Sequence, residues 1–291
     1  MTPLRYPGGK TQLYAYVKEI SLCNNLLGQA YIEPFAGGAG LAVKLLLNGD
    51  MKRIVINDLD PSIYCFWYSI LNSTDKFCHL VYETAVTTHE WLKQKAIYLK
   101  QDAANPLELG FATFFLNRTN ISGVIKGGII GGKKQIGNHK ISARFNKENL
   151  ITKICEIAKH REQIALYNLD AHELLQPKYM RKYPMALINL DPPYVINGAK
   201  LYKNSFGENE HRKLSETISS CRRKWIVTYD VCPLVAKLYS NYRYAFLDIK
   251  YSINRGKQAQ EYIFFSNNLV IPANTTYYKR EQVEIETNLI S

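Results

Sequence analysis

Seven short apolar runs separated by helical patterns constrain the fold of this chain more than any other feature. The runs are Tyr31–Phe35, Arg53–Asn57, Ile164–Asn168, Ala186–Leu190, Trp225–Tyr229, Tyr244–Ile249 and Glu261–Phe265. Helical patterns cover Gly40–Leu47, Pro61–Leu71 and His211–Cys221. Because this alternation is typical of a mostly parallel sheet with helices on both faces, the sequence predicts an α/β fold.

One long segment, from residue 73 to residue 150, breaks the alternation. Its first half, through Leu116, has a helical pattern, and its second half is basic and rich in glycine. A long insertion between the strands of a sheet is typical of a second domain or a functional subdomain. We therefore predict a catalytic domain formed by residues 1–72 plus 151–291, and an inserted domain formed by residues 73–150.

A strand runs into a glycine-rich turn at Glu33–Gly40 (E-P-F-A-G-G-A-G), and Asp58 follows the next strand. Glycines let a backbone turn sharply and approach a ligand closely. A carboxylate at the end of the second strand can accept hydrogen bonds from both hydroxyls of a ribose. The pattern therefore indicates an adenosine-type ligand at the carboxyl edge of the sheet. The alternative is a packing turn, with Asp58 as the N-cap of the next helix.

The fourth apolar run ends directly in D-P-P-Y, formed by Asp191, Pro192, Pro193 and Tyr194. Two prolines in succession fix φ and remove backbone donors, so this segment is stiff. The Asp191 carboxylate and the Pro192 carbonyl could accept both hydrogens of an aromatic amine, which would localise the lone pair of its nitrogen. Tyr194 could stack on the base. The motif predicts catalysis at an exocyclic amine, and a rigid turn without chemistry is the alternative.

The glycine-rich half of the insert carries an unusual charge. The chain has 37 basic and 25 acidic residues, a formal net charge of +12, and no acidic residue lies between Leu109 and Lys147. Uniform positive charge indicates a polyanionic partner, although a solvated surface loop with chance charge is the alternative. The candidate DNA-contacting residues are Arg118, Asn120, Ser122, Lys126, Lys133, Lys134, Arg144 and Asn146.

Other kinds of site are less well supported. Gly9, Lys10 and Thr11 look like the end of a phosphate-binding loop, but Leu4 stands where its first glycine belongs and no buried strand leads in. The six cysteines form no C-x-x-C pair and lie at no zinc-ligand spacing to a histidine, so we expect no metal. No apolar run approaches the roughly 20 residues of a membrane helix, and no signal-peptide stretch is visible. We expect a cytoplasmic, nucleoid-associated protein.

The order of these motifs resembles that of a known family. R-Y-P-G-G-K at Arg5–Lys10, then E-P-F-A-G-G-A-G, a long insert and D-P-P-Y are similar to the Dam-like (D12) class of DNA adenine-N6 methyltransferases, which use S-adenosylmethionine. The resemblance implies a Rossmann-like, seven-stranded sheet with its last strand antiparallel, and a mainly helical target-recognition insert. It also implies site-specific methylation of the N6 amine of an adenine that flips out of duplex DNA.

The resemblance assigns roles to residues as well. Tyr6 and Lys10 would contact S-adenosylmethionine, Lys10 at its carboxylate end, and Asp58 would bind the ribose. The other donor-binding residues would be Glu33, Phe35, Gly37, Gly38, Gly40, Asp170 and Asp191. Asp170 could equally cap the helix that follows it. The segment Ser252–Gln260 could close over the flipped base or form an ordinary hairpin loop.

Several alternatives stay open. Methylation of RNA adenine or of cytosine N4 would use the same acceptors, because cytosine also presents an exocyclic amine. A DNA-binding protein with a vestigial site is a different class, and the intact D-P-P-Y and Asp58 argue against it. We expect duplex DNA as the partner, and a cognate restriction endonuclease is a candidate second partner. No membrane partner is expected, and the chain is expected to be a monomer or weak dimer.

Overall fold

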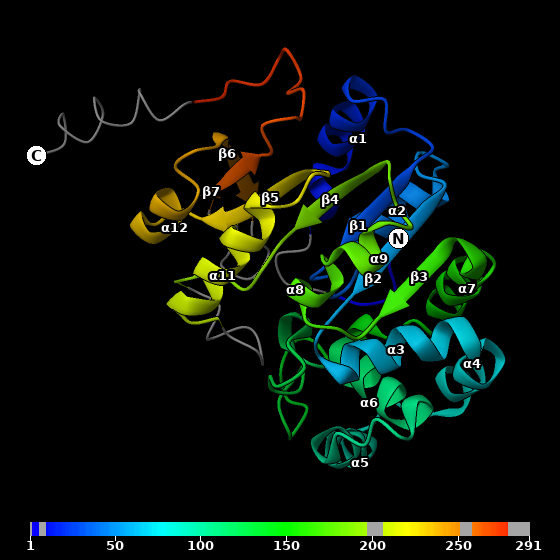
Figure 1. Ribbon diagram of the computed structural model, residues 1–291. Helices are drawn as coiled ribbons and strands as arrows, with labels where there is room; N and C mark the ends of the chain where they lie inside the picture. The colour runs from blue at the N-terminus through cyan, green and yellow to red at the C-terminus, as the bar shows by residue number, and fades with distance from the viewer. Residues whose placement is uncertain (1, 6–9, 197–205, 251–257, 279–291) are drawn as a thin grey trace, which may run out of the picture.

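The computed structural model describes residues 2–5, 10–196, 206–250 and 258–278 (Figure 1). Tyr6 and most of the segment Ser252–Gln260 lie outside these ranges. The described part contains a seven-stranded sheet. Its strands are β1 (Ala30–Glu33), β2 (Arg53–Asn57), β3 (Ile164–Tyr167), β4 (Ala186–Leu190), β5 (Lys224–Asp230), β6 (Arg243–Lys250) and β7 (Gln258–Phe265).

The strand order is β3-β2-β1-β4-β5-β7-β6. All neighbouring pairs are parallel except the two that involve β7, which runs antiparallel to β5 and to β6. This confirms the predicted α/β sheet with an antiparallel last strand. Every predicted apolar run is a strand, although β1 ends at Glu33 rather than at Phe35. Pro34 follows Glu33, and proline has no N–H with which to continue the strand pairing.

Helices cover both faces of the sheet (Figure 1). On one face lie α1 (Tyr14–Cys23), α2 (Gly40–Leu47) and α3 (Pro61–Asn72), and on the other lie α8 (Ala171–Leu174), α9 (Pro177–Met180), α11 (Glu208–Ser219) and α12 (Pro233–Leu238). Alternate residues of each strand enter opposite cores, as Tyr31 and Ile32 do. All residues of β1 and β4 are buried, because helices cover both faces of these parallel strands, and apart from Glu33 and Asn189 they are apolar.

The predicted helices are also present. α2 has the expected bounds, α3 is one residue longer than predicted, and α11 begins at Glu208, three residues before the predicted start. The Gly207 N–H donates to the Glu210 carboxylate across 2.9 Å, which satisfies a backbone group at the helix start. That local interaction explains the earlier beginning of α11.

The insert is helical in its first half, as predicted. It contains α4 (Thr74–Glu83), α5 (Thr88–Lys100), α6 (Pro106–Thr119), η2 (Ile121–Gly123), η3 (Ile141–Arg144) and the start of α7 (Lys147–Ala158). Figure 1 shows α4, α5 and α6 gathered beside α3 at one end of the molecule. The rings of Phe66 in α3 and Phe114 in α6 stack with centroids 6.0 Å apart. The insert thus continues one of the two sheet cores, and its division from the catalytic domain at residue 150 stays a prediction.

The glycine-rich half of the insert is held by backbone pairing. Asn120 and Ile129 form an antiparallel bridge, and the Ile130 N–H donates to the Thr119 carbonyl across 2.9 Å. Ile129 and Ile130 are buried in this turn. A stretch that its glycines suggested to be a flexible loop is therefore anchored against the end of α6, because two isoleucines bury their side chains there.

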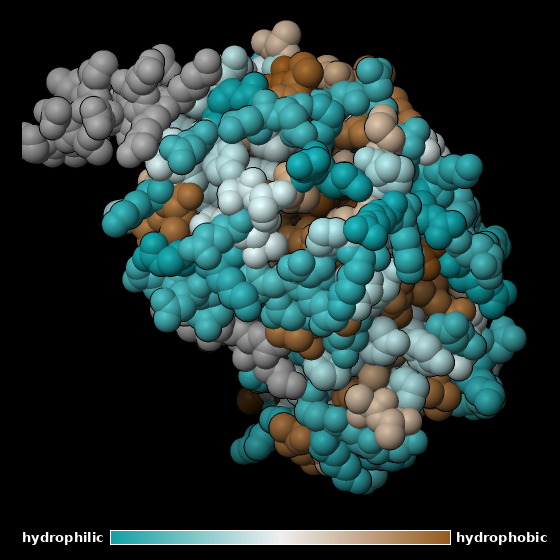
Figure 2. Space-filling view, in the orientation of Figure 1, coloured by the Kyte–Doolittle hydropathy of each residue, from teal (hydrophilic) through white to brown (hydrophobic). Residues whose placement is uncertain are grey.

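The face of the molecule in Figure 2 is mainly hydrophilic, and apolar residues form separate patches on it. None of the helices in the described ranges is long and apolar enough to cross a membrane. The number of subunits stays a prediction.

Candidate active site

A cavity of about 270 Å³ lies at the carboxyl ends of β1, β2 and β4. Strand order reverses between β1 and β4, and ligands of open α/β sheets bind outside such a switch point. The predicted residues that line the cavity are Lys10, Glu33, Phe35, Gly38, Gly40, Asp58, Asp170, Asp191 and Pro193. Residues that sequence reasoning missed are Thr2, Leu4, Thr11, Asp60, Asn189 and Phe206. The fold therefore brings the separate motifs of the sequence to one place.

The glycine turn after β1 is shaped by two residues with positive φ, Gly37 at 47° and Ala39 at 43°. The Gly37 N–H donates to Asp58 Oδ2 across 2.9 Å, and Trp67 Nε1 donates to the Gly37 carbonyl across 2.9 Å. The turn is thus fixed from two sides before α2 begins. A residue with a side chain at position 37 would be strained, because L-residues rarely adopt this φ.

Asp58 links the glycine turn to the segment that leads into α3. Its Oδ1 accepts the Asp60 N–H across 2.9 Å while its Oδ2 holds Gly37. The N-cap of α3 is Asp60, which accepts the Ser62 N–H across 2.9 Å. The alternative that Asp58 caps this helix is therefore wrong. Burial raises the pKa of Asp58 to about 6.

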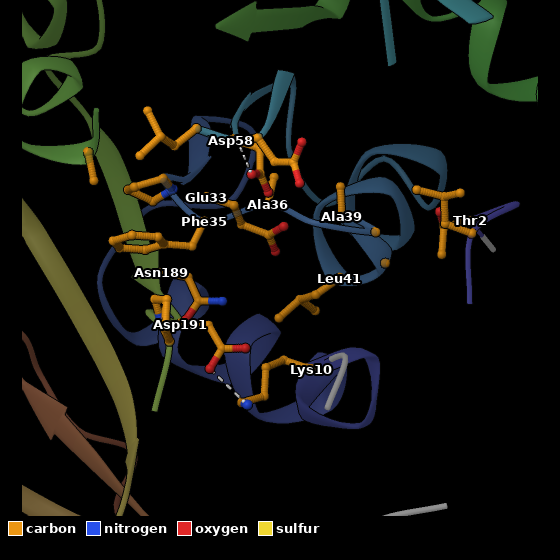
Figure 3. A pocket seen from close by; sticks show the side chains of 18 of the residues that line it. Thr2, Lys10, Glu33, Phe35, Ala36, Ala39, Leu41, Asp58, Asn189 and Asp191 are labelled. Atoms are coloured by element: carbon orange, nitrogen blue, oxygen red, sulfur yellow. Dashed lines mark hydrogen bonds and ion pairs between the residues drawn. The ribbon is translucent and has the colours of Figure 1, made fainter. Parts of the chain in front are cut away.

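Glu33 ends β1 as a buried carboxyl group that borders the cavity. Figure 3 shows the Glu33 and Asp58 carboxyl groups directed into the same space. Burial, together with the negative charge of Asp191, raises the pKa of Glu33 to about 8, and the polar groups of Tyr31 and Asn189 oppose the rise. A cationic ligand would favour the ionised form of Glu33.

Asp191 is fixed through one of its oxygens. Lys10 Nζ lies 2.9 Å from Asp191 Oδ1 (Figure 3), and the Thr228 hydroxyl donates to the same oxygen across 2.8 Å. Thr228 belongs to β5 and Lys10 to η1 (Lys10–Leu13), so two elements position this carboxylate. Asp191 Oδ2 takes part in neither contact.

Lys10 is buried, with 4% of its side chain exposed. Its Nζ also donates to the Tyr194 hydroxyl across 2.7 Å and lies 3.4 Å from Glu261 Oε2. An ammonium has three hydrogens, and these contacts direct it toward the D-P-P-Y motif. The arrangement does not favour the expected contact between Lys10 and the carboxylate end of the donor. Glu261 was missed, although an acid within the apolar run E-Y-I-F-F is a signal that could have found it.

Tyr194 shares Lys10 with Asp191 as a hydrogen-bonding partner. Its ring centroid lies 6.4 Å from that of Tyr229, and Lys10 Nζ lies 5.0 Å from its centroid. The ring is therefore oriented through both its face and its hydroxyl. Stacking of Tyr194 on a base stays a prediction.

Asp170 has the capping role that the sequence left open, and its contact with the adenine of the donor stays a prediction. It caps α8 by accepting the His172 N–H across 2.8 Å, and it lines the cavity. Phe206 also lines the cavity, with its ring centroid 5.8 Å from that of Phe35 in an edge-to-face arrangement. Nothing near Phe206 in the sequence indicates this position.

Most of the candidate DNA-contacting residues are exposed. These are Lys126, Lys133, Lys134, Arg144 and Asn146, whereas Ser122 is half-buried. Asn146 Oδ1 also caps α7 by accepting the Asn149 N–H across 2.9 Å. Asn120 differs, because its side chain is fully buried.

The Asn120 amide has a structural role. Its Oδ1 accepts from Trp91 Nε1 across 2.6 Å, and its Nδ2 donates to the carbonyls of Val124 and Ile125 across 3.0 and 2.7 Å. This placement leaves no amide group exposed for a base edge. We therefore leave Asn120 out of the DNA-contacting residues proposed below.

Three arginines meet where the N-terminal segment touches the insert. Arg118 donates to the carbonyls of Arg144 and Pro3, and Arg5 donates to the Asn120 carbonyl across 3.1 Å. Burial, together with the positive charges of Arg5 and Arg144, lowers the pKa of Arg118 to about 10. Arg5 and Arg144 also line a second cavity of about 330 Å³. Arg5 was not predicted to belong to this basic group.

Fold and site together define the class of Rossmann-like methyltransferases. Residues 6–253 match the family model described as D12 class N6 adenine-specific DNA methyltransferase, and the chain belongs to this family. The resemblance in the motif order is thereby confirmed. Among the described residues, no group of three or more His, Cys, Asp or Glu side chains is arranged to hold a metal ion.

The chain is also similar to individual known proteins. The chain is 26% identical over 167 residues to the Type II methyltransferase M.MjaIII of Methanocaldococcus jannaschii, a match that covers 50% of this chain and 55% of that protein. The chain thus spans little more than half the length of this relative. The rRNA methyltransferase aviRa from Streptomyces viridochromogenes is 12% identical, with a TM-score of 0.37 over 90% of this chain and 87% of that one. A protein from Pyrococcus horikoshii described as an RNA methyltransferase is 10% identical, with a TM-score of 0.43 over 90% and 85%.

Proposed function

We propose that this protein transfers a methyl group from S-adenosylmethionine to the N6 amine of adenine at specific sites in duplex DNA. One observation carries the proposal. Asp191 lies at the border of the same cavity as Gly38 and Asp58, and Lys10 and Thr228 fix its Oδ1. The acceptor of the amine and the site for the methyl donor therefore adjoin each other.

The charges of the cavity fit the donor. S-adenosylmethionine carries a sulfonium with an electrophilic methyl group and an α-ammonium. Glu33 is buried and Asp58 is half-buried, and both have raised pKa values, so a cation that stabilises their ionised forms binds favourably. Glu33 would face the methionine part and Asp58 the ribose, with Phe35 and Phe206 closing the side of the cavity.

The amine would be held by two acceptors. Asp191 Oδ2 and the Pro192 carbonyl accept one N6 hydrogen each, which favours a tetrahedral nitrogen with a localised lone pair. Positive charge develops on this nitrogen during the transfer, and a carboxylate fixed in advance stabilises it. The Thr228 and Lys10 contacts matter here because they hold Asp191 in place without using Oδ2. Tyr194 stacks on the base and keeps the nitrogen in line with the methyl group.

The insert would bind the DNA. An adenine inside a duplex cannot reach a cavity at a sheet edge, so the base flips out at a cost of a few kcal/mol. The exposed Lys126, Lys133 and Lys134 contact phosphates, which positions the duplex. Arg144, with Arg5 behind it, attracts a further phosphate at the second cavity. Ser122 is a candidate for contact with a base edge.

The test is chemical identification of the product. Purified protein is incubated with labelled S-adenosylmethionine and mixed-sequence duplex DNA, and the DNA is digested to nucleosides. We expect N6-methyladenine as the labelled nucleoside. N4-methylcytosine, or label in RNA only, would favour the other amine substrates, and absence of transfer with intact donor binding would favour an inert DNA-binding protein.

The M. jannaschii relative is named as a Type II methyltransferase. On that basis, we include a role in restriction–modification, with a cognate endonuclease as partner, in the proposal. DNA from cells that express this chain would then resist one particular endonuclease. Resistance to none of the endonucleases of its genomic neighbourhood would favour a solitary enzyme.

A further inference from the structure

Glu261 on β7 has no part in the mechanism above. Only 1% of its side chain is exposed, and its Oε2 lies 3.4 Å from Lys10 Nζ. Lys10 Nζ in turn lies 2.9 Å from Asp191 Oδ1 and donates to the Tyr194 hydroxyl. A buried ammonium therefore stands between a second carboxyl group and the catalytic one.

The charged groups around Glu261 come from several elements. Lys10 reaches it from η1, and Asp191 and Tyr194 reach toward the same ammonium from the end of β4. The residue opposite it on β5 is Asp230, whose carboxylate accepts the N–H groups of Val195 and Ile196 across 3.1 and 2.7 Å. The residue opposite it on β6 is the apolar Leu247. Among these described neighbours, Lys10 is the one cation, and it serves two carboxyl groups.

Burial of a second carboxyl group beside one ammonium is costly, because ionised groups lose their hydration. A glutamine or an apolar residue would fill the same position on β7 at a lower cost. The geometry instead links Glu261 to the reacting amine through two contacts, from Oε2 to Lys10 and from Lys10 to Asp191. A residue can adjust the charge on Asp191 only through such a chain of contacts.

We propose that Glu261 is a positioning residue that, through Lys10, sets how strongly Asp191 accepts the amine of the target base. The inference rests on the proposed role of Asp191 in methyl transfer. With Glu261 ionised, the three groups carry a net charge of about −1, and Lys10 is shared between two carboxylates. With Glu261 protonated, the net charge is about zero, and Asp191 is the one ionised carboxylate of the three groups. The ionised state therefore stabilises the developing cation on nitrogen better.

The change of state falls near neutral pH. Burial and the negative charge of Asp191 raise the pKa of Glu261 to about 7, against the opposing effects of Lys10 and Tyr194. The turnover number, kcat, is therefore expected to rise as pH increases through about 7 when the donor is saturating. Saturation with donor matters, because it removes the effect of Glu33 and Asp58 on donor binding.

The experiment compares kcat against pH for the wild type, Glu261→Gln, Glu261→Asp and Asp248→Asn. Asp248 is an exposed carboxylate on the same hairpin and is the matched control. At about pH 8.5 we expect Glu261→Gln to reduce kcat about tenfold, the lower end of the range for residues that act through another side chain. Near pH 6 the kcat of Glu261→Gln equals that of the wild type, since both proteins then lack the negative charge at position 261. Glu261→Asp keeps the rise with pH, and Asp248→Asn matches the wild type throughout.

Three results would overturn the inference. The first is a wild-type pH profile in Glu261→Gln, and the second is a change in KM for the donor without a change in kcat. The third is an undiminished effect of Glu261→Gln in a Lys10→Gln background, because the proposed action passes through Lys10. Thermal unfolding of each variant separates loss of fold from loss of positioning. A wild type that does not methylate adenine would instead refute the proposed function on which the inference rests.

Discussion

Binding of the methyl donor is predicted to depend on pH through Glu33. Burial raises the pKa of Glu33 to about 8, so the free protein holds this group mostly protonated at neutral pH. The α-ammonium of S-adenosylmethionine requires the ionised form. Donor binding must therefore remove a proton from Glu33, and affinity increases as pH rises toward the pKa.

The size of the effect follows from the ionised fraction. A carboxyl group with a pKa of about 8 is about 1% ionised at pH 6 and about 24% ionised at pH 7.5. If only the ionised form binds the donor, the dissociation constant falls about 25-fold over this range. Asp58, with a pKa of about 6, contributes only about a twofold change over the same range.

Isothermal calorimetry at about pH 6 and about pH 7.5 measures this directly. The control ligand is 5′-methylthioadenosine, which keeps the adenosine but lacks the amino-acid part. We expect the large change for S-adenosylmethionine, about a twofold change for the control ligand, and loss of the large change in Glu33→Gln. Equal pH dependence of the two ligands, or an unchanged pH dependence in Glu33→Gln, would refute the reasoning.

Three further predictions concern the insert and the core. Gly123 has a φ of 77°, and a Cβ there would overlap the Arg5 carbonyl oxygen, whereas Gly28 has a φ of 73° with open space around it. Gly123→Ala should therefore lower the free energy of unfolding by roughly 1–3 kcal/mol more than Gly28→Ala does. Equal shifts in Tm for the two variants would contradict this. Arg144→Gln should weaken DNA binding at all sequences and reduce the slope of log affinity against log salt by about 1, and an unchanged slope would exclude a phosphate contact. Glu261 has a raised pKa of about 7, so its contribution to stability is full below about pH 4.5 and is lost as pH rises through about 7. Glu261→Gln should therefore stabilise the free protein by about 3 kcal/mol at pH 8 and by little at pH 5, as measured by urea unfolding. An equal gain in stability at both pH values would contradict the predicted pH dependence.

The strands could be predicted because their apolar runs are local signals. Arg53–Asn57 and Ala186–Leu190 have the predicted bounds, since parallel strands covered on both faces form short, nearly continuous apolar runs. The cavity could be predicted in outline, because carboxyl ends of parallel strands meet at one edge. Glu33 ends one such strand, and Asp58 and Asp191 directly follow two others.

Contacts that depend on packing between distant segments could not be predicted in this way. Lys10 meets Asp191 and Glu261 only after η1, β4 and β7 come together, so its charge partners are invisible in the sequence. Asn120 has the composition of a surface recognition residue, but Trp91 and two carbonyl groups enclose it. Phe206 reaches the cavity from a distant part of the chain, with no motif around it.

The most direct measurement for the central claim is the single-turnover rate of Asp191→Asn with saturating donor and duplex DNA. This variant keeps the shape of the side chain and removes the charge that holds the amine. We predict a fall in the rate of at least about 100-fold, while the calorimetric affinity for 5′-methylthioadenosine stays within about twofold of the wild type. Methyl transfer to adenine at the full wild-type rate would contradict the assignment of Asp191 as the acceptor.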